Sequence, residues 1–291
     1  MPELAWDSIV GSLIGDRVQK PRACGITMVI DTGVGLRQLE DVLELAGHCI
    51  DHWKFGFGTS VFHTRKLLAA KLALLAEHSV LSLPGGTLLE VALVEHHCRV
   101  YMRHARELGF AGVEISDGTI PLPAFRRRNL IRCAREAGLV PITEVGKKDP
   151  RQQPSADELA EQALEDLAAG AEWVVVESRE SGKAVGIYDQ HGQVIDEAVA
   201  IIRARMGEAV GRLIWEAPLK DQQAYLVQHF GTNVGLGNIQ PDQVLAVEAL
   251  RNRLRFDTMR WVTGELVRSG AWDPLAVEPP LGEWPLIKKS S

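Results

Sequence analysis

The decapeptide Val140-Pro-Ile-Thr-Glu-Val-Gly-Lys-Lys-Asp149 combines an apolar strand, a carboxylate, a glycine turn and two lysines. Its β-branched residues are typical of a parallel strand that is covered on both faces. Gly146 frees the backbone to turn, so Lys147 and Lys148 follow at the carboxyl end of the strand. The stretch therefore predicts the end of an active-site strand.

Similar units recur seven more times along the chain, and several apolar runs close on an acidic residue. Ala111-Gly-Val leads into Glu114, Trp173-Val-Val-Val leads into Glu177, and Leu213-Ile-Trp leads into Glu216. A helical pattern follows each predicted strand, with a repeat of about 30 residues. Eight such repeats favour an α/β fold with a single closed (β/α)8 TIM-type barrel over an open sheet.

The predicted barrel spans residues 25–258, after an N-terminal lead-in of residues 1–24. Residues 259–291 form a C-terminal extension that contains Trp272, Trp284 and several prolines. An isolated apolar tail would be a sticky surface, so we expect its tryptophans to pack on the outside of the barrel or on a partner subunit.

The composition excludes several classes of protein. The chain has 291 residues, 46% of them hydrophobic, and a net charge of -6, which argues against a nucleic-acid-binding protein. No apolar run reaches the roughly 20 residues that a membrane helix needs. The N-terminus lacks a basic leader and an apolar segment, so a cytoplasmic location is expected. The four cysteines show no metal-binding or disulfide spacing, which indicates reduced thiols.

In such a barrel, residues just past each strand converge on one bowl at the carboxyl ends of the strands. The predicted bowl contains Asp31, Lys54, Thr87, Glu114, Ser116, Asp117, Glu144, Lys147, Lys148, Glu177, Arg179, Glu216 and Asn238. Converging carboxylates repel unless cations or protons compensate them, and oxygen ligands suit Mg2+. The candidate Mg2+ ligands are Glu114, Glu144, Glu177, Asp31 and Glu216. Alternatively, some of these acids pair with Lys54 or Arg179 and hold the rim together.

Lys147 and Lys148 cannot both point into the bowl, because successive side chains of an extended segment point to opposite sides. The inward lysine is suited to Schiff-base chemistry, proton donation or anion binding. A Lys-Lys pair is also common in solvated loops. Its position after a strand and a glycine favours the functional interpretation.

Two short glycine turns are candidates for anion binding, because each exposes backbone amides at the start of a helix. They are Gly85-Gly86-Thr87 and Gly237-Asn238-Ile239. Barrels often bind phosphate after strands seven and eight, which adds weight to the second turn. The candidate substrate-binding residues are Lys54, Arg179, Ser116, Gly237 and Asn238.

The chain resembles the phosphosulfolactate synthase family, which starts one route of coenzyme M biosynthesis. The matching motifs appear in family order: Lys54-Phe-Gly-Phe-Gly-Thr-Ser60, Pro84-Gly-Gly-Thr87, Val113-Glu-Ile-Ser-Asp-Gly118, Thr143-Glu-Val-Gly-Lys-Lys148, Arg179-Glu-Ser-Gly-Lys183 after Glu177, Glu216-Ala-Pro218, Gln222-Gln223 and Leu254-Arg-Phe-Asp-Thr258. The resemblance implies a Mg2+-dependent (β/α)8 barrel lyase that adds sulfite to phosphoenolpyruvate, giving (2R)-phospho-3-sulfolactate.

Under that resemblance, the nucleophile joins C3 of the enol phosphate and leaves an enolate-like intermediate, which Mg2+ stabilises. Lys147 or Lys148 would deliver the proton, and Lys54 and Arg179 would clamp the anions. We expect small anionic substrates, no nucleic-acid or membrane partner, and a homo-oligomer. The alternatives are a related barrel that adds a different nucleophile and a non-catalytic member with a binding or stress-related role.

Two positions depart from the family pattern. Asp31-Thr32-Gly33 replaces the family's Asp-Lys-Gly, and Gly235 replaces an asparagine in Asn233-Val234-Gly235-Leu236. Both changes are expected on the active face. Loss of a lysine and an amide there would bear on whether sulfite is the nucleophile.

Overall fold

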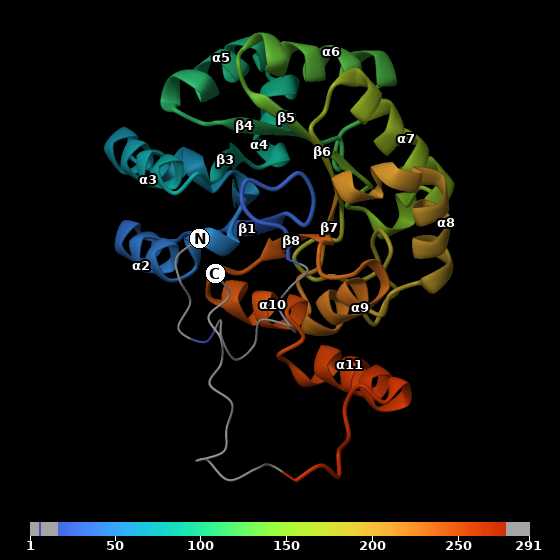
Figure 1. Cartoon of the computed structure of the whole chain (residues 1–291). Helices are drawn as coiled ribbons and strands as arrows, with labels where there is room; N and C mark the ends of the chain where they lie inside the picture. Colours follow the sequence, from blue (N-terminus) through green and yellow to red (C-terminus); the bar gives the residue numbers. More distant parts are fainter. Residues whose placement is uncertain (1–5, 7–16, 278–291) are drawn as a thin grey trace.

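Eight parallel strands form the centre of the molecule (Figure 1). The computed structural model describes residue 6 and residues 17–277. The strands are β1 (Thr27–Asp31), β2 (His52–Phe55), β3 (Leu81–Pro84), β4 (Gly112–Ile115), β5 (Val140–Val145), β6 (Trp173–Val176), β7 (Leu213–Glu216) and β8 (Gly235–Ile239).

The strands are arranged in a nearly closed ring, in the order β3-β2-β1-β8-β7-β6-β5-β4. β1 pairs in parallel with both β2 and β8, so the first and last strands meet. Between β3 and β4 the Ala111 N–H donates to the Ser82 carbonyl at 3.1 Å. The predicted (β/α)8 barrel is therefore confirmed.

Helices surround this ring in Figure 1. They are α2 (Leu36–Ala46), α3 (Arg65–Glu77), α4 (Gly86–Val94), α5 (Cys98–Leu108), α6 (Ala124–Glu136), α7 (Ala156–Ala169), α8 (Asp196–Met206), α9 (Lys220–Phe230), α10 (Val244–Arg251) and α11 (Phe256–Ser269). Short helical turns span Gly47–Cys49, Gly56–Phe62, Pro150–Gln152, Gly207–Arg212 and Pro241–Gln243. A capping box of Ser155 and Glu158 fixes the start of α7, because each side chain satisfies an amide that the helix leaves unpaired.

Strand alternation divides the apolar residues into two layers. Inside the ring, six buried side chains form one cluster: Ile26, Met28, Leu83, Ile142, Val175 and Ile214. A larger cluster lies between the strands and the helices and includes Trp53, Phe55 and Trp215. Because side chains two residues apart share a face, Glu144, Glu177 and Glu216 lie directly beyond Ile142, Val175 and Ile214. The inner cluster is thus the floor beneath a polar layer.

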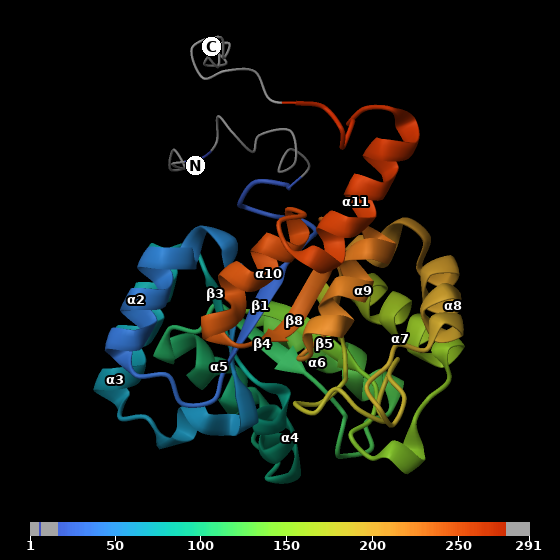
Figure 2. The same ribbon diagram turned by 90° about the horizontal axis from the view of Figure 1, so that it is seen from below.

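The C-terminal helix α11 stands off from the ring of helices (Figure 2). Only Thr258 and Val262 of this helix are buried, and it packs on α9 and α10. Trp261 and Trp272 are each half exposed, so the described part of the chain does not bury them fully. Trp284 lies outside the described residues.

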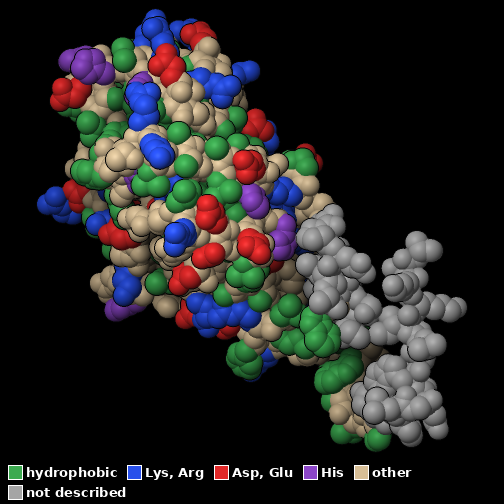
Figure 3. All heavy atoms as spheres, turned by 90° about the vertical axis from the view of Figure 1, so that its left-hand side faces the viewer, with side chains coloured by type: hydrophobic (Ala, Val, Ile, Leu, Met, Phe, Trp, Pro, Cys, Tyr) green, Lys and Arg blue, Asp and Glu red, His purple; other side chains and the backbone are tan. Residues whose placement is uncertain are grey.

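The described surface carries acidic and basic side chains together. Figure 3 shows them mixed on the face that bears α2 and α3. None of the helices in the described part of the chain has the length and apolar character needed to cross a membrane. All four cysteines are free thiols, as the sequence indicates.

Candidate active site

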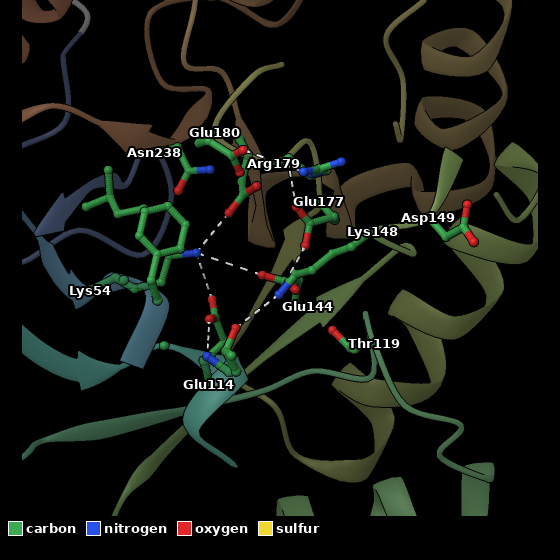
Figure 4. Close-up of a pocket in the computed structure, with 17 residues that line it drawn as sticks. Lys54, Glu114, Thr119, Glu144, Lys148, Asp149, Glu177, Arg179, Glu180 and Asn238 are labelled. Atoms are coloured by element: carbon green, nitrogen blue, oxygen red, sulfur yellow. Dashed lines mark hydrogen bonds and ion pairs between the residues drawn. The ribbon is translucent and has the colours of Figure 1, made fainter. Parts of the chain in front are cut away.

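A pocket of about 470 Å3 opens at the carboxyl ends of the strands, above the inner apolar cluster (Figure 4). Eight sequence-predicted residues line it together: Lys54, Thr87, Glu114, Glu144, Lys148, Glu177, Arg179 and Glu216. Asn238 also lines it, from the end of β8. Most of the residues predicted at the strand ends therefore lie in one pocket.

Lys54 lies at the centre of a ring of carboxylates. Its Nζ is 2.8 Å from Glu216 Oε1, 3.1 Å from Glu114 Oε1 and 3.8 Å from Glu144 Oε2. Burial lowers the pKa of Lys54, but the three glutamates outweigh it and hold that pKa well above its ordinary value. Lys54 is therefore a fixed positive charge that links its own strand, β2, to β4, β5 and β7.

Glu114 and Glu216 have both carboxylate oxygens engaged. Besides Lys54, Glu114 accepts from the Gly86 N–H at 2.6 Å and Glu216 accepts from the Ser178 N–H at 3.0 Å. Burial raises the pKa of Glu216, yet the charge and hydrogen bond of Lys54 bring it below its ordinary value. These two acids are satisfied by the protein itself.

Glu144 and Glu177 are less completely compensated. Burial, and then the negative charge of Glu177, raise the pKa of Glu144 well above its ordinary range. Burial and the charge of Glu216 likewise raise the pKa of Glu177 to about 7. The site thus holds more buried negative charge than Lys54 balances, which favours binding of a proton or a cation.

Three buried oxygens in this pocket have no hydrogen-bond partner: Glu144 Oε1, Glu177 Oε2 and Asn238 Oδ1. Magnesium is commonly bound by one or two carboxylates with waters and substrate oxygens completing its shell. Among the described residues no three His, Cys, Asp or Glu side chains are grouped as a metal site. Of the five predicted ligands, Glu144 and Glu177 are the two that keep a buried oxygen without a hydrogen-bond partner, and this chemistry suits a cation.

The two adjacent lysines lie on different sides of the strand end. Lys148 lines the pocket, with its Nζ 3.3 Å from Thr87 Oγ1 and 3.9 Å from Glu177 Oε2. Burial lowers the pKa of Lys148, but Glu144 and the neighbouring acids raise it above its ordinary value. Lys147 does not line the pocket and instead donates to Asp117 Oδ2 at 2.5 Å.

Three pocket residues other than glycine have positive φ: Phe57, Arg179 and Asn238. This left-handed conformation is unfavourable for a side-chain-bearing residue, and it recurs at functional sites where the surroundings enforce it. At Arg179, the N–H donates to Glu177 Oε1 at 2.6 Å, which fixes the turn. The side chain is 40% exposed, and its only ion pair in the described chain is with Glu180 at 3.6 Å.

The prediction that Asp31 lies in the bowl is wrong. Asp31 is fully buried outside the strand ring, where it accepts from Lys71 Nζ, Trp53 Nε1 and the N–H of Val34. Met28 and Ile30 of the same strand point inward, so alternation turns Asp31 toward α3. Burial raises the pKa of Asp31, but the hydrogen bond from Lys71 and others bring it below its ordinary value.

Ser116 and Gly237 also lie outside the pocket lining. Ser116 Oγ donates to Glu90 Oε1 at 2.5 Å, and a Cβ on Gly237 would meet Met28 of the inner cluster. Glu90 was missed by the strand-end argument because it lies on α4. A lone carboxylate within the apolar run Gly86–Val94 is the signal that could have found it.

The two departures from the family pattern are likewise outside the pocket lining, contrary to expectation. Thr32 is exposed. Gly235 lies at the start of β8, where a Cβ would come within 2.2 Å of the Leu213 carbonyl oxygen. The backbone of β7 therefore leaves no room for a side chain at Gly235.

Comparison with known proteins gives a match over most of the chain. The sequence model of the family described as (2R)-phospho-3-sulfolactate synthase (ComA) matches residues 15–257. A phosphosulfolactate synthase of Methanothermobacter thermautotrophicus is 39% identical over 245 residues, covering 84% of this chain and 94% of that protein. One from Bacillus subtilis is 36% identical over 248 residues, covering 83% and 95%.

Among solved structures, the YdjI aldolase from Escherichia coli K12 superposes with a TM-score of 0.51 at 13% sequence identity. The match covers 84% of this chain and 91% of that one. At this level of identity the likeness concerns the fold alone.

Proposed function

Because the chain belongs to the (2R)-phospho-3-sulfolactate synthase (ComA) family, we propose that it catalyses the addition of sulfite to phosphoenolpyruvate. Sulfite sulfur would form a bond to C3, and the electron pair of the C2–C3 double bond would move toward the carboxylate. Protonation at C2 then gives (2R)-phospho-3-sulfolactate. The phosphate is retained and no oxidant is needed.

The observation that carries the proposal is the position of Lys148. It supplies an ammonium to a pocket whose other nearby groups are mostly acids, and those acids keep it protonated. A protonated amine at the edge of the substrate space suits delivery of a proton to C2. Lys147 is engaged with Asp117, which makes Lys148 the stronger candidate for this role.

Binding of the substrate anions is assigned to Lys54, Arg179 and Asn238. Lys54 contributes a permanent positive charge from the floor of the pocket, although glutamates already surround its ammonium. Arg179 is at the exposed side, where its planar guanidinium suits bidentate binding of phosphate or sulfonate. The side-chain amide of Asn238 offers a neutral partner.

A Mg2+ ion is part of the proposal, with Glu144 and Glu177 as the residues that would hold it. When bound there, it would supply the positive charge that an enolate-like intermediate requires. Each glutamate has one oxygen that accepts no hydrogen bond, and each has a raised pKa, which supports this assignment. Without a cation, the raised pKa values of both groups favour protonation in its place.

The proposal includes small anionic substrates, a cytoplasmic location and a homo-oligomer. The net charge of -6 supports the absence of nucleic acid as a partner. Half-exposed Trp261 and Trp272 on the α11 side support a surface that a second subunit covers. Sedimentation of the purified protein tests the last point directly.

The decisive experiment combines the purified protein with phosphoenolpyruvate, sulfite and Mg2+, and follows the products by phosphorus NMR. A new phosphomonoester signal that requires both sulfite and protein is expected. Persistence of the phosphoenolpyruvate signal at all sulfite concentrations, with folded protein, would reject the proposal. Replacing sulfite by other nucleophiles tests the related-barrel alternative.

A further inference from the structure

Lys147 and Lys148 both contact one dipeptide, Asp117-Gly118, in the loop after β4, but in different ways. On one side, Lys147 Nζ donates to Asp117 Oδ2 at 2.5 Å and to the Asp117 carbonyl oxygen at 2.7 Å. On the other, the Lys148 N–H donates to the Gly118 carbonyl oxygen at 3.1 Å. The stem of Lys148 lies so close to Gly118 that a Cβ there would meet its Cε at 3.1 Å.

Asp117 is itself fixed from behind by a buried arginine. Arg127 Nη1 donates to Asp117 Oδ1 at 3.0 Å, while its Nε lies 2.8 and 2.9 Å from the two oxygens of Asp166. Arg127 Nη2 donates to the Glu144 carbonyl oxygen at 2.8 Å. The guanidinium that holds Asp117 therefore also holds the end of β5, four residues before Lys148.

We infer that Asp117 is a positioning residue that keeps the Lys147 ammonium outside the pocket and so leaves Lys148 as the amine inside it. The pocket has a surplus of carboxylates, so it attracts any ammonium that is free to reach it. Lys147 is the nearest competing ammonium, since it is the residue directly before Lys148 in the chain. This inference rests on the proposed role of Lys148 as proton donor.

The test is a double-mutant cycle of Asp117→Asn and Lys147→Met, with phosphoenolpyruvate and sulfite as substrates. Asparagine keeps an oxygen for Arg127 but loses the charge that holds Lys147. We expect kcat of Asp117→Asn to fall about 10- to 100-fold, with KM changing less than about threefold. Lys147→Met alone should cost less than about tenfold.

The double variant gives the outcome that a purely structural role would not. Removing Lys147 removes the competitor, so kcat of Asp117→Asn/Lys147→Met should return to within about threefold of Lys147→Met alone. A double variant as slow as Asp117→Asn would overturn the inference. Lys147→Arg retains the ion pair and should keep activity near that of the wild type.

Glu172→Gln provides a matched control, because it neutralises the acid of a partly exposed ion pair with Arg212 before β6. A crystal structure of Asp117→Asn gives a readout that needs no turnover. Lys147 Nζ should then lie within 4 Å of a pocket carboxylate; an unmoved Lys147 would reject the inference. If the wild type itself makes no product, the proposed function fails. The crystal structure of Asp117→Asn still shows whether Asp117 keeps Lys147 out of the pocket.

Discussion

Two buried lysines in this barrel have opposite surroundings. Lys71, on the outer side of the strands, meets Asp31, whose oxygens also accept from Trp53 and backbone amides. Lys54, on the inner side, is shared by three glutamates, and a fourth, Glu177, lies nearby with an oxygen that accepts no hydrogen bond. The outer pair is internally balanced, whereas the inner group has excess negative charge.

The difference separates a structural ion pair from a prospective active site. A buried pair with all its hydrogen bonds made stabilises one conformation and needs nothing further. A buried group of like charges is costly unless another species enters it, which is a frequent property of catalytic sites. Five perturbations test whether the two regions divide stability and activity in this way.

Removal of divalent cations should have the largest effect, and only on the inner region. Chelation is expected to abolish turnover of phosphoenolpyruvate, because Glu144 and Glu177 would then lack their counter-charge, and added Mg2+ should restore it. Activity assays and elemental analysis measure this. Full turnover by metal-free protein would show that protons and lysines balance the site alone.

Replacing Lys148 by Met should lower kcat by roughly 100- to 10,000-fold at saturating phosphoenolpyruvate, because it removes the proposed proton donor. Lys147→Met should retain at least about tenfold more activity than Lys148→Met. Circular dichroism of both variants checks that they are folded. Equal, small losses would place the acid elsewhere and leave these lysines as anion-binding groups.

Replacing Lys71 by Met should act on stability instead. The change leaves the fully buried Asp31 carboxylate without its positive partner. The free energy of unfolding should therefore fall by about 3 to 5 kcal/mol, measured by urea denaturation. Glu172→Gln, which breaks a partly exposed pair, should cost no more than about 1 kcal/mol. A loss of kcat in folded Lys71→Met as large as that of Lys148→Met would contradict the division.

The pH dependence of the free energy of unfolding should have opposite signs for the two regions. The folded-state pKa of Glu177 is raised to about 7, so the folded protein binds more protons and its stability should decline as pH rises from about 4.5 to 7. Asp31 has a lowered pKa, so its contribution is present above about pH 4 and is lost as pH falls below that.

Thermal melts of metal-free protein between pH 5 and 7.5 measure the first of these terms. Wild type should lose on the order of 1 to 3 kcal/mol over this range beyond what Glu177→Gln loses. Mg2+ should reduce the difference. If the stability of wild type and of Glu177→Gln changed with pH in the same way, Glu177 would not carry an unbalanced buried charge.

The smallest effect is expected from truncation after Arg260, which removes most of α11 but touches neither lysine region. Burial of Val262 against α9 and α10 predicts a fall in melting temperature of a few degrees or a change of oligomer. Sedimentation and thermal melts check both. An unchanged profile would show that residues 261–291 contribute nothing to stability or assembly.

Much of the pocket was accessible to sequence reasoning, because strand ends converge in this fold. Glu144, Glu177 and Glu216 each follow an inward apolar residue by two positions, and each lines the pocket. The same rule, applied to Ile30, would have turned Asp31 away from it. The rule could not find Glu90, since a helix residue reaches Ser116 in the loop after β4 only through the packing of α4 on β4.

The sequence alone determined the alternation of eight strands with helices, and with it the end of the barrel at which the polar residues gather. Only the tertiary structure decided how charges are shared there. Lys54 and Glu216 are 162 residues apart, yet closure of the ring brings them to 2.8 Å. Likewise, Asp117 and Arg127 decide which of two adjacent lysines faces the pocket. Periodicity fixes directions along one strand, whereas partners across the ring depend on how all eight strands close.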